Sequence, residues 1–135
     1  MKPFLDTHVL VYAALSDDPY RPIAERLLAA GGTISVQVLN EFTNVARGKL
    51  NWPWPDIEAM LALVRNRSRR VRDISVATHE AALVLARDHR LSFYDALIVA
   101  AAIEAGCDTL FTEDMQHGRK FGSLTIVNPF IESIP

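Results

Sequence analysis

The chain has 135 residues, a net charge of −2 and 50% apolar residues, which predicts one globular domain over 1–135 with a packed core. The near balance of charge argues against nucleic-acid binding by bulk charge, but it leaves room for a local basic patch. A single cysteine excludes an internal disulfide framework and a cysteine zinc site. Because no uncharged apolar run reaches membrane-spanning length and nothing resembles a signal peptide, we expect a soluble, cytoplasmic protein.

Short apolar strands alternate with longer helical patterns along the chain. Strands are expected over 2–6, 33–36, 71–75, 108–112 and 123–127. Helices are expected over 9–15, 21–30, 37–50, 56–69, 76–89 and 91–107. Two prolines within 51–55 must interrupt the chain between two of these helices. Strands separated by helices predict a parallel sheet covered by helices on both faces.

The helix expected over 91–107 is the most apolar element of the chain. Ser92 is placed to be its N-cap, and Asp95 follows three residues later, as in a capping box. Gly106 can end the helix in a left-handed conformation. Residues 96–103 are apolar on every side, which is typical of a buried helix. Asp95 therefore stands at the mouth of a core helix, where it either only caps the helix or faces a site that needs negative charge.

Four carboxylates are embedded in apolar sequence, namely Asp6, Glu41, Asp95 and Asp114. Asp6 and Asp114 follow predicted strands, and open α/β sheets bind ligands at that edge. Glu41 has apolar neighbours on its helix face, which direct it toward the core. No Lys or Arg lies in these segments, so a convergent group would need a cation. Oxygen ligands without a His or Cys cluster favour Mg²⁺ or Mn²⁺ over Zn²⁺.

Each acid also has a structural explanation of its own. Asp95 can cap its helix, Asp6 can cap the next helix, and Asp114 can be a turn residue. A helix-face acid among Val and Phe, such as Glu41, is harder to explain in this way. One shared site accounts for all four positions together, and a metal held there could activate water and neutralise a phosphodiester oxygen.

Four segments resemble the acidic motifs of PIN domains: 4–7 (FLDT), 35–42 (SVQVLNEF), 94–102 (YDALIVAAA) and 112–118 (TEDMQHG). The chain is most similar to the small VapC-like ribonuclease toxins of prokaryotic toxin–antitoxin pairs, over residues 2–130. This resemblance implies a three-layer α/β/α sandwich with a central parallel sheet of about five strands. It also implies a metal-dependent endoribonuclease that acts on RNA, with a cognate antitoxin that blocks the site, and a homodimer.

The resemblance assigns roles to individual residues. The acidic positions that hold Mg²⁺ or Mn²⁺ and carry catalysis match Asp6, Glu41, Asp95 and Asp114. Thr7 and Thr112 match hydroxyl residues that flank the first and last acids and orient a ligand or water. His8 stands where many members carry Asn, and it adds a group that can be protonated near neutral pH.

Basic residues must bring RNA to such an acidic site. Arg119 and Lys120 directly follow the last motif and are the first candidates for phosphate contacts. The denser run comprises Arg65, Arg67, Arg69, Arg70 and Arg72. It is interpreted first as a solvated helix end, with binding of substrate or an acidic partner as the alternative. Trp52 and Trp54 are expected either to anchor a partner or to pack between the two flanking helices.

Other functions remain as alternatives. A phosphotransferase or phosphatase with Asp6 as nucleophile would want a second Asp where His8 stands, and a Lys at a strand end. A catalytically silent PIN-fold module for protein binding would not need four intact acids. A PIN nuclease of RNA processing outside a toxin–antitoxin pair would share the same residues. The sequence does not identify the RNA target, the cleavage sequence or the number of metals.

Overall fold

Short apolar and β-branched runs form the strands of a central sheet. The structure, a computed structural model, describes residues 1–131, so 132–135 of the predicted domain lie outside it. Its strands are β1 (Pro3–Leu5), β2 (Thr33–Ser35), β3 (Arg70–Arg72), β4 (Thr109–Phe111), β5 (Lys120–Phe121) and β6 (Leu124–Val127). They are ordered β3-β2-β1-β4-β6-β5, and only β5 pairs with its neighbour in the antiparallel sense. The predicted parallel sheet is thus confirmed.

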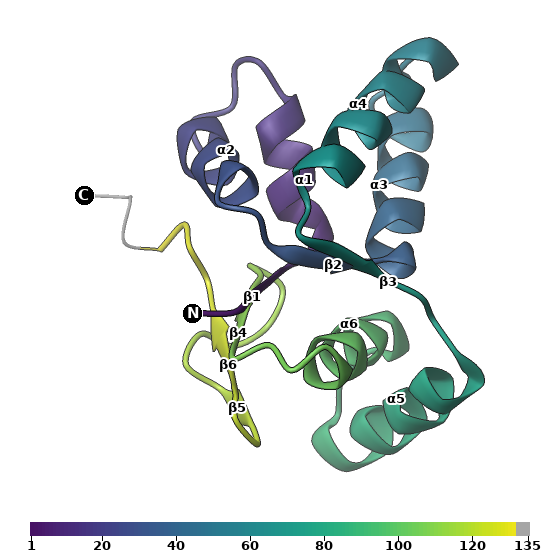
Figure 1. Ribbon diagram of the computed structural model, residues 1–135, viewed down its shortest axis with the longest axis vertical. Helices are drawn as coiled ribbons and strands as arrows, with labels where there is room; N and C mark the ends of the chain where they lie inside the picture. Colours follow the sequence, from purple (N-terminus) through teal and green to yellow (C-terminus); the bar gives the residue numbers. More distant parts are fainter. Residues whose placement is uncertain (132–135) are drawn as a thin grey trace.

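Helices cover both faces of this sheet. They are α1 (Thr7–Ala14), α2 (Arg21–Ala29), α3 (Val36–Gly48), α4 (Trp54–Arg67), α5 (Val76–His89) and α6 (Phe93–Glu104). Figure 1 shows α1 to α4 grouped above strands β1 to β3, and α5 and α6 below them. The predicted three-layer α/β/α architecture is confirmed. Within residues 1–131, no helix is both long and apolar enough to cross a membrane.

The sheet has a sixth strand that the sequence pattern did not predict. Lys120 and Phe121 form β5, which turns back through Gly122 onto β6 and pairs Phe121 with Leu124. Gly122 has φ +61°, the left-handed conformation that tight hairpin turns require. A strand of two residues is too short to show alternation.

Several predicted element ends differ from the structure by one to three residues, and two of these differences have identifiable reasons. The strand expected over 71–75 ends at Arg72, because Ser75 instead caps α5 in a capping box with Thr78. The helix expected over 56–69 is α4, which begins two residues earlier, at Trp54. Its first turn tolerates Pro55, since that turn has free N–H groups in any helix.

The most apolar helix is α6, as expected. Ser92 accepts a hydrogen bond from the backbone N–H of Asp95, at 3.3 Å. Every residue from Ala96 to Ala102 is buried. Ile103 departs from the prediction, since it is 44% exposed and lines an open hollow between α5 and the β5–β6 hairpin. The helix ends at Glu104, and Gly106 just beyond it has φ +72°, the left-handed conformation that was predicted for the cap.

The two tryptophans between α3 and α4 differ in their surroundings. Trp52 packs edge-on against Phe42, with ring centroids 6.2 Å apart, and its carbonyl accepts a hydrogen bond from Arg47. It therefore fills the joint between the two helices. Trp54 is 50% exposed, and the Arg47 guanidinium lies 5.0 Å from its ring centroid.

Gly32 gives a test of core packing. A Cβ at this position would lie 2.7 Å from Cγ of Leu5, which is fully buried in β1. We expect Gly32→Ala to destabilise the protein by about 1–3 kcal/mol, because the core must shift to accept the methyl group. Gly48→Ala is the matched control, since a Cβ at Gly48 would meet no atom within 4 Å and Gly48 is a helical residue of α3, where Ala is favoured over Gly. Urea unfolding of both variants measures the difference, and equal stability would contradict this account of the core.

Candidate metal and active site

The acidic residues meet where the parallel strands end. Leu5 of β1 and Phe111 of β4 are partners in the sheet, so Asp6 and Thr112 follow them side by side. The backbone N–H of Asp6 donates to the carbonyl of Phe111 at 3.0 Å, which fixes this register. Helix α6 brings Asp95 to the same edge. Ligand sites in open α/β sheets lie at this edge.

Asp6 is the most deeply buried of the four acids, with only 3% of its surface exposed. Its Oδ1 accepts a hydrogen bond from the backbone N–H of Thr7 at 2.7 Å, so Asp6 caps α1. Its Oδ2 accepts from the Thr112 hydroxyl, also at 2.7 Å. Each carboxylate oxygen thus has one protein donor and keeps a lone pair for a further ligand.

Three of the four predicted acids converge. Carboxylate oxygens of Asp6, Asp95 and Asp114 all lie within 4.8 Å of one another, a spacing that one metal ion can bridge. Glu41 is not part of this trio. Its Oε2 accepts a hydrogen bond from the hydroxyl of Thr7 at 2.6 Å. Because Thr7 directly follows Asp6, this bond ties Glu41 to the chain beside the trio.

The electrostatics of the site reflect negative charge that no Lys or Arg of residues 1–131 neutralises. Burial, opposed by the hydrogen bonds from Thr112 and Thr7, raises the pKa of Asp6 to about 6, and the charges of Asp114 and Glu41 add to this rise. Burial likewise raises the pKa of Asp95. Among residues 1–131, no Lys or Arg forms an ion pair with any of the four acids. The donor set therefore fits a hard divalent cation.

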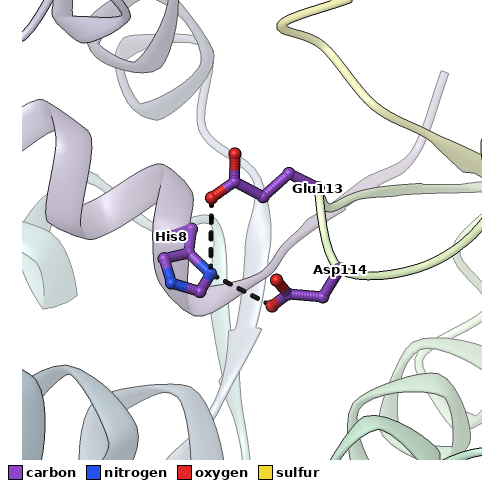
Figure 2. Close-up of side chains that lie close together, drawn as sticks. All are labelled: His8, Glu113 and Asp114. Carbon is purple, nitrogen blue, oxygen red and sulfur yellow. Dashed lines mark hydrogen bonds and ion pairs between the residues drawn. The ribbon is translucent and has the colours of Figure 1, made fainter.

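His8 lies beside this trio and contacts its third member. Figure 2 shows the imidazole of α1 between Glu113 and Asp114, which follow β4. His8 Nδ1 lies 3.0 Å from Oδ2 of Asp114 and 3.8 Å from Oε1 of Glu113. The hydrogen bond between His8 and Asp114 raises the pKa of the imidazole and lowers that of the carboxyl. Ligand atoms of His8, Glu113 and Asp114 also lie within 4.8 Å of one another.

Tyr12 is a further member of the site that the sequence analysis missed. Its hydroxyl donates to Oε1 of Glu113 at 2.5 Å, and burial together with this bond raises the pKa of the phenol. Tyr12 follows His8 by four residues on α1, so the two side chains share a helix face. The four-residue spacing of His8 and Tyr12 could have pointed to Tyr12, but only with knowledge that Glu113 lies next to this face of α1.

The loop that carries Glu113 and Asp114 is attached at both ends. The backbone N–H of Thr112 donates to the carbonyl of Val127, and that of Gly118 donates to Ile126, at 3.0 and 2.8 Å. Between these points, the Thr112 hydroxyl accepts from the N–H of Asp114 at 3.1 Å. His117 Nδ1 accepts from the N–H of Asn128, at 3.0 Å. The loop is therefore fixed against β6.

The structure does not bring the two predicted phosphate contacts to the acids. The Arg119 guanidinium donates to the carbonyl of His89 at 2.9 Å and lies 4.7 Å from the ring centroid of Phe121. Lys120 pairs with Thr125, which in turn pairs with Thr109 at the start of β4. Lys120 therefore stands level with the opposite edge of the sheet. That Arg119 and Lys120 contact phosphates of bound RNA at some distance from the acids stays a prediction.

Four of the five arginines in the run lie at the end of α4 or near the edge where the parallel strands begin. Arg65 and Arg67 lie in the last turn of α4, as the helix-end interpretation requires. Arg69 and Arg70 line a hollow of about 240 Å³ with Lys2, at the edge where the parallel strands begin. A larger hollow of about 820 Å³ lies between α3 and α4 and includes Arg65, but none of the four acids lines it. Hollow size therefore does not identify the acidic site.

The raised pKa of Asp6 predicts a pH dependence of the metal-free protein. The pKa is about 6 when folded against an ordinary value of 3.8, so the folded state binds more protons between these values. Stability from this group is present at low pH and is lost as pH rises through 6, by up to about 3 kcal/mol. Asp6→Asn has no such loss. We expect its stability relative to wild type to rise from pH 4 to pH 8 in EDTA, measured by urea unfolding; a constant difference would contradict the shift.

Comparisons with known proteins agree with this fold. The family model of the PIN domain matches residues 4–120. No curated protein sequence gave a significant match. VapC20 of Mycobacterium tuberculosis, described as a toxin that cleaves the sarcin–ricin loop, has a similar structure. It is 23% identical, with a TM-score of 0.66 over 84% of this chain and 92% of that one.

Two further solved structures share the fold. VapBC2 of Rickettsia felis, bound to a promoter DNA fragment, is 22% identical, with a TM-score of 0.68 over 93% of this chain and 97% of that one. A toxin–antitoxin complex from Klebsiella pneumoniae is 22% identical, with a TM-score of 0.68 over 95% and 98% of the two chains. Since the family model covers most of the sequence and the acids of its motifs meet at one edge of the sheet, the chain belongs to the PIN domain family.

Proposed function

We propose that the protein is a metal-dependent endoribonuclease that cleaves RNA phosphodiester bonds and acts as the toxin of a toxin–antitoxin pair. One observation carries the proposal: the buried carboxylate of Asp6 converges with Asp95 and Asp114, and among residues 1–131 no Lys or Arg pairs with them, while His8 contacts only Asp114 of the three. Membership of the PIN family and the fold shared with VapC proteins support it. Fold alone does not determine function, so the site carries the argument.

Asp6, Asp95 and Asp114 would hold Mg²⁺, or Mn²⁺ in its place. Carboxylate oxygens are the ligands that these hard ions prefer, and burial, with a smaller contribution from neighbouring carboxylates, raises the pKa of Asp6 and so disfavours its charged form without a counter-ion. When bound, such an ion supplies a counter-charge for a phosphodiester oxygen and a lowered pKa for a water molecule.

The side chains around the acids hold them in position for this chemistry. The backbone N–H of Thr7 donates to Oδ1 of Asp6, and the Thr112 hydroxyl donates to Oδ2, so the Asp6 carboxylate cannot rotate freely. Asp95 is fixed on the first turn of a buried helix. Glu41, held by the Thr7 hydroxyl, and Asp114, held by His8, would complete the metal's surroundings or orient water. Pre-positioned groups of this kind avoid reorganisation during the reaction.

An antitoxin and a second copy of the chain are the proposed protein partners. The structure from Klebsiella pneumoniae is named as a toxin–antitoxin complex, and FitAcB of Neisseria gonorrhoeae, 18% identical with a TM-score of 0.63, shares the fold. By analogy, an antitoxin would block the acidic edge of this chain, and the chain would form a homodimer. Trp54, half exposed between α3 and α4, is a candidate contact for either partner.

A catalytically silent PIN-fold binding module is the main alternative. It would not require three carboxylates to converge around a buried Asp6. A PIN nuclease of RNA processing outside a toxin–antitoxin pair would keep the same site, and a small overlapping upstream reading frame would separate the two. Metal binding and RNA cleavage decide between nuclease and silent module.

Cleavage of RNA gives the first test. We expect the wild type to cut total RNA in Mg²⁺ or Mn²⁺, and Asp6→Asn to lose at least about 100-fold of that activity, because one metal-bridging carboxylate is gone. Excess EDTA should abolish cleavage by the wild type. Glu80→Gln, which removes an exposed carboxylate from α5, is the matched control and should keep full activity. Full activity of Asp6→Asn, or in EDTA, would refute the proposal.

Metal binding gives a second test that does not depend on activity. We expect Mn²⁺ to raise the Tm of the wild type, since a ligand at about 100 times its Kd adds about 2.7 kcal/mol to stability. The rise should disappear in Asp95→Asn and persist in Glu80→Gln. Differential scanning fluorimetry over a Mn²⁺ series measures it. A wild type that shows no shift would favour the silent module.

A further inference from the structure

One exposed aromatic side chain directly precedes an acid of the candidate site in the sequence. Tyr94 exposes 59% of its surface, more than Trp54 at 50%. Within the part of the chain that the structure describes, no side chain or backbone group forms a hydrogen bond with its hydroxyl. Exposure alone is ordinary for a single residue. The position of Tyr94 gives it meaning.

Tyr94 directly precedes Asp95 on the first turn of α6. Consecutive Cα atoms are about 3.8 Å apart, so the backbone of Tyr94 adjoins a residue whose carboxylate belongs to the converging trio, and the two side chains leave the helix in different directions. Residues further along α6, from Ala96 to Ala102, are buried. Tyr94 is thus the place where this core helix presents a large apolar surface beside the acids.

A row of rings supports Tyr94 from one side. Its ring lies 5.9 Å from that of Phe93 at an interplanar angle of 60°, and Phe93 lies 5.3 Å from His79 of α5 at 68°. Phe93 also packs against a buried cluster of α5 and α6, which comprises Ala82, Ala96, Leu97 and Ala100. The tilted contact covers at most one face of the Tyr94 ring. A flat face therefore remains available on a supported side chain.

Binding of RNA at the acidic edge would gain from a contact that does not depend on charge, such as an aromatic ring face. Carboxylates repel the phosphates of RNA, and Arg119 and Lys120 lie elsewhere in the fold. Stacking on an aromatic ring needs no charge, and unpaired RNA bases stack on Tyr, Phe and His side chains. A nucleotide whose phosphate lay at the three acids would have its base close to the start of α6, where Tyr94 is exposed.

We propose that Tyr94 stacks on the base of a nucleotide next to the scissile phosphate, and that Phe93 and His79 hold its ring in place. Tyr94 is then a positioning residue, which binds the substrate strand without reading its sequence, since every base has a π face. This inference rests on the proposed ribonuclease function and deepens it by requiring an unpaired substrate nucleotide.

The test uses an RNA oligonucleotide with one mapped cleavage site. Single abasic replacements are made on each side of the scissile phosphate, and kcat and KM are measured for the wild type, Tyr94→Ala and Tyr94→Phe. At one of the two positions, loss of the base should cost the wild type on the order of tenfold in kcat/KM, mainly through KM. The same replacement should cost Tyr94→Ala less than about twofold, because its platform is already absent. Tyr94→Phe, which keeps the ring, should stay near wild type.

The outcomes separate this inference from the function on which it rests. An equal cost of both abasic replacements in wild type and Tyr94→Ala would overturn the stacking contact while leaving the nuclease intact. Normal cleavage by Tyr94→Ala, with loss only of binding to a protein partner, would assign Tyr94 to that partner and also overturn it. A wild type that cleaves no RNA would overturn both proposals. The Mn²⁺ shift of Tyr94→Ala should match wild type, which shows that Asp95 is still in place.

Discussion

The site depends on one physical constraint, the burial of the Asp6 carboxylate at the edge of the sheet. Asp6 continues a strand whose residues Phe4 and Leu5 are wholly inside the core, so its side chain is carried inward with them. Keeping an ionised carboxylate there is unfavourable unless donors or a cation compensate. Thr7 and Thr112 supply donors, but the raised pKa of Asp6 shows that they compensate only in part. The burial that secures β1 in the core thus also creates a preference for a bound cation.

Much of the fold could be predicted because its signals are local. Ser92 and Gly106 mark the two ends of α6 through capping chemistry that needs no tertiary partner. Strand β5 could not be predicted in this way, since its two residues are ordered by hydrogen bonds to β6 rather than by their own pattern. The antiparallel direction of β5 also explains why Lys120, close to the last motif in sequence, is carried back toward the level where β4 begins, while Arg119 is held by the carbonyl of His89.

The candidate site followed from one topological rule, and its finer arrangement did not. Parallel strands end at a common edge, so acids placed after strands were expected to meet there, and Asp6 and Asp114 do. Glu41 stands apart from the trio and is linked to it through Thr7. Its position depends on the packing of α3 against α1, which the local sequence does not specify. The contact of Tyr12 with Glu113 depends on side-chain directions across 101 residues of separation, which no local pattern encodes.

The attachment of the 112–118 loop to β6 has a thermodynamic consequence for ligand binding. Backbone bonds from Thr112 and Gly118, with the His117 contact to Asn128, order this segment before any ion arrives. Ordering a free loop would cost about 1–2 kcal/mol for each residue fixed. A segment ordered in advance leaves that cost to folding, so affinity at the acidic edge would be set by the hydration and charge of the incoming ion rather than by the entropy of the chain.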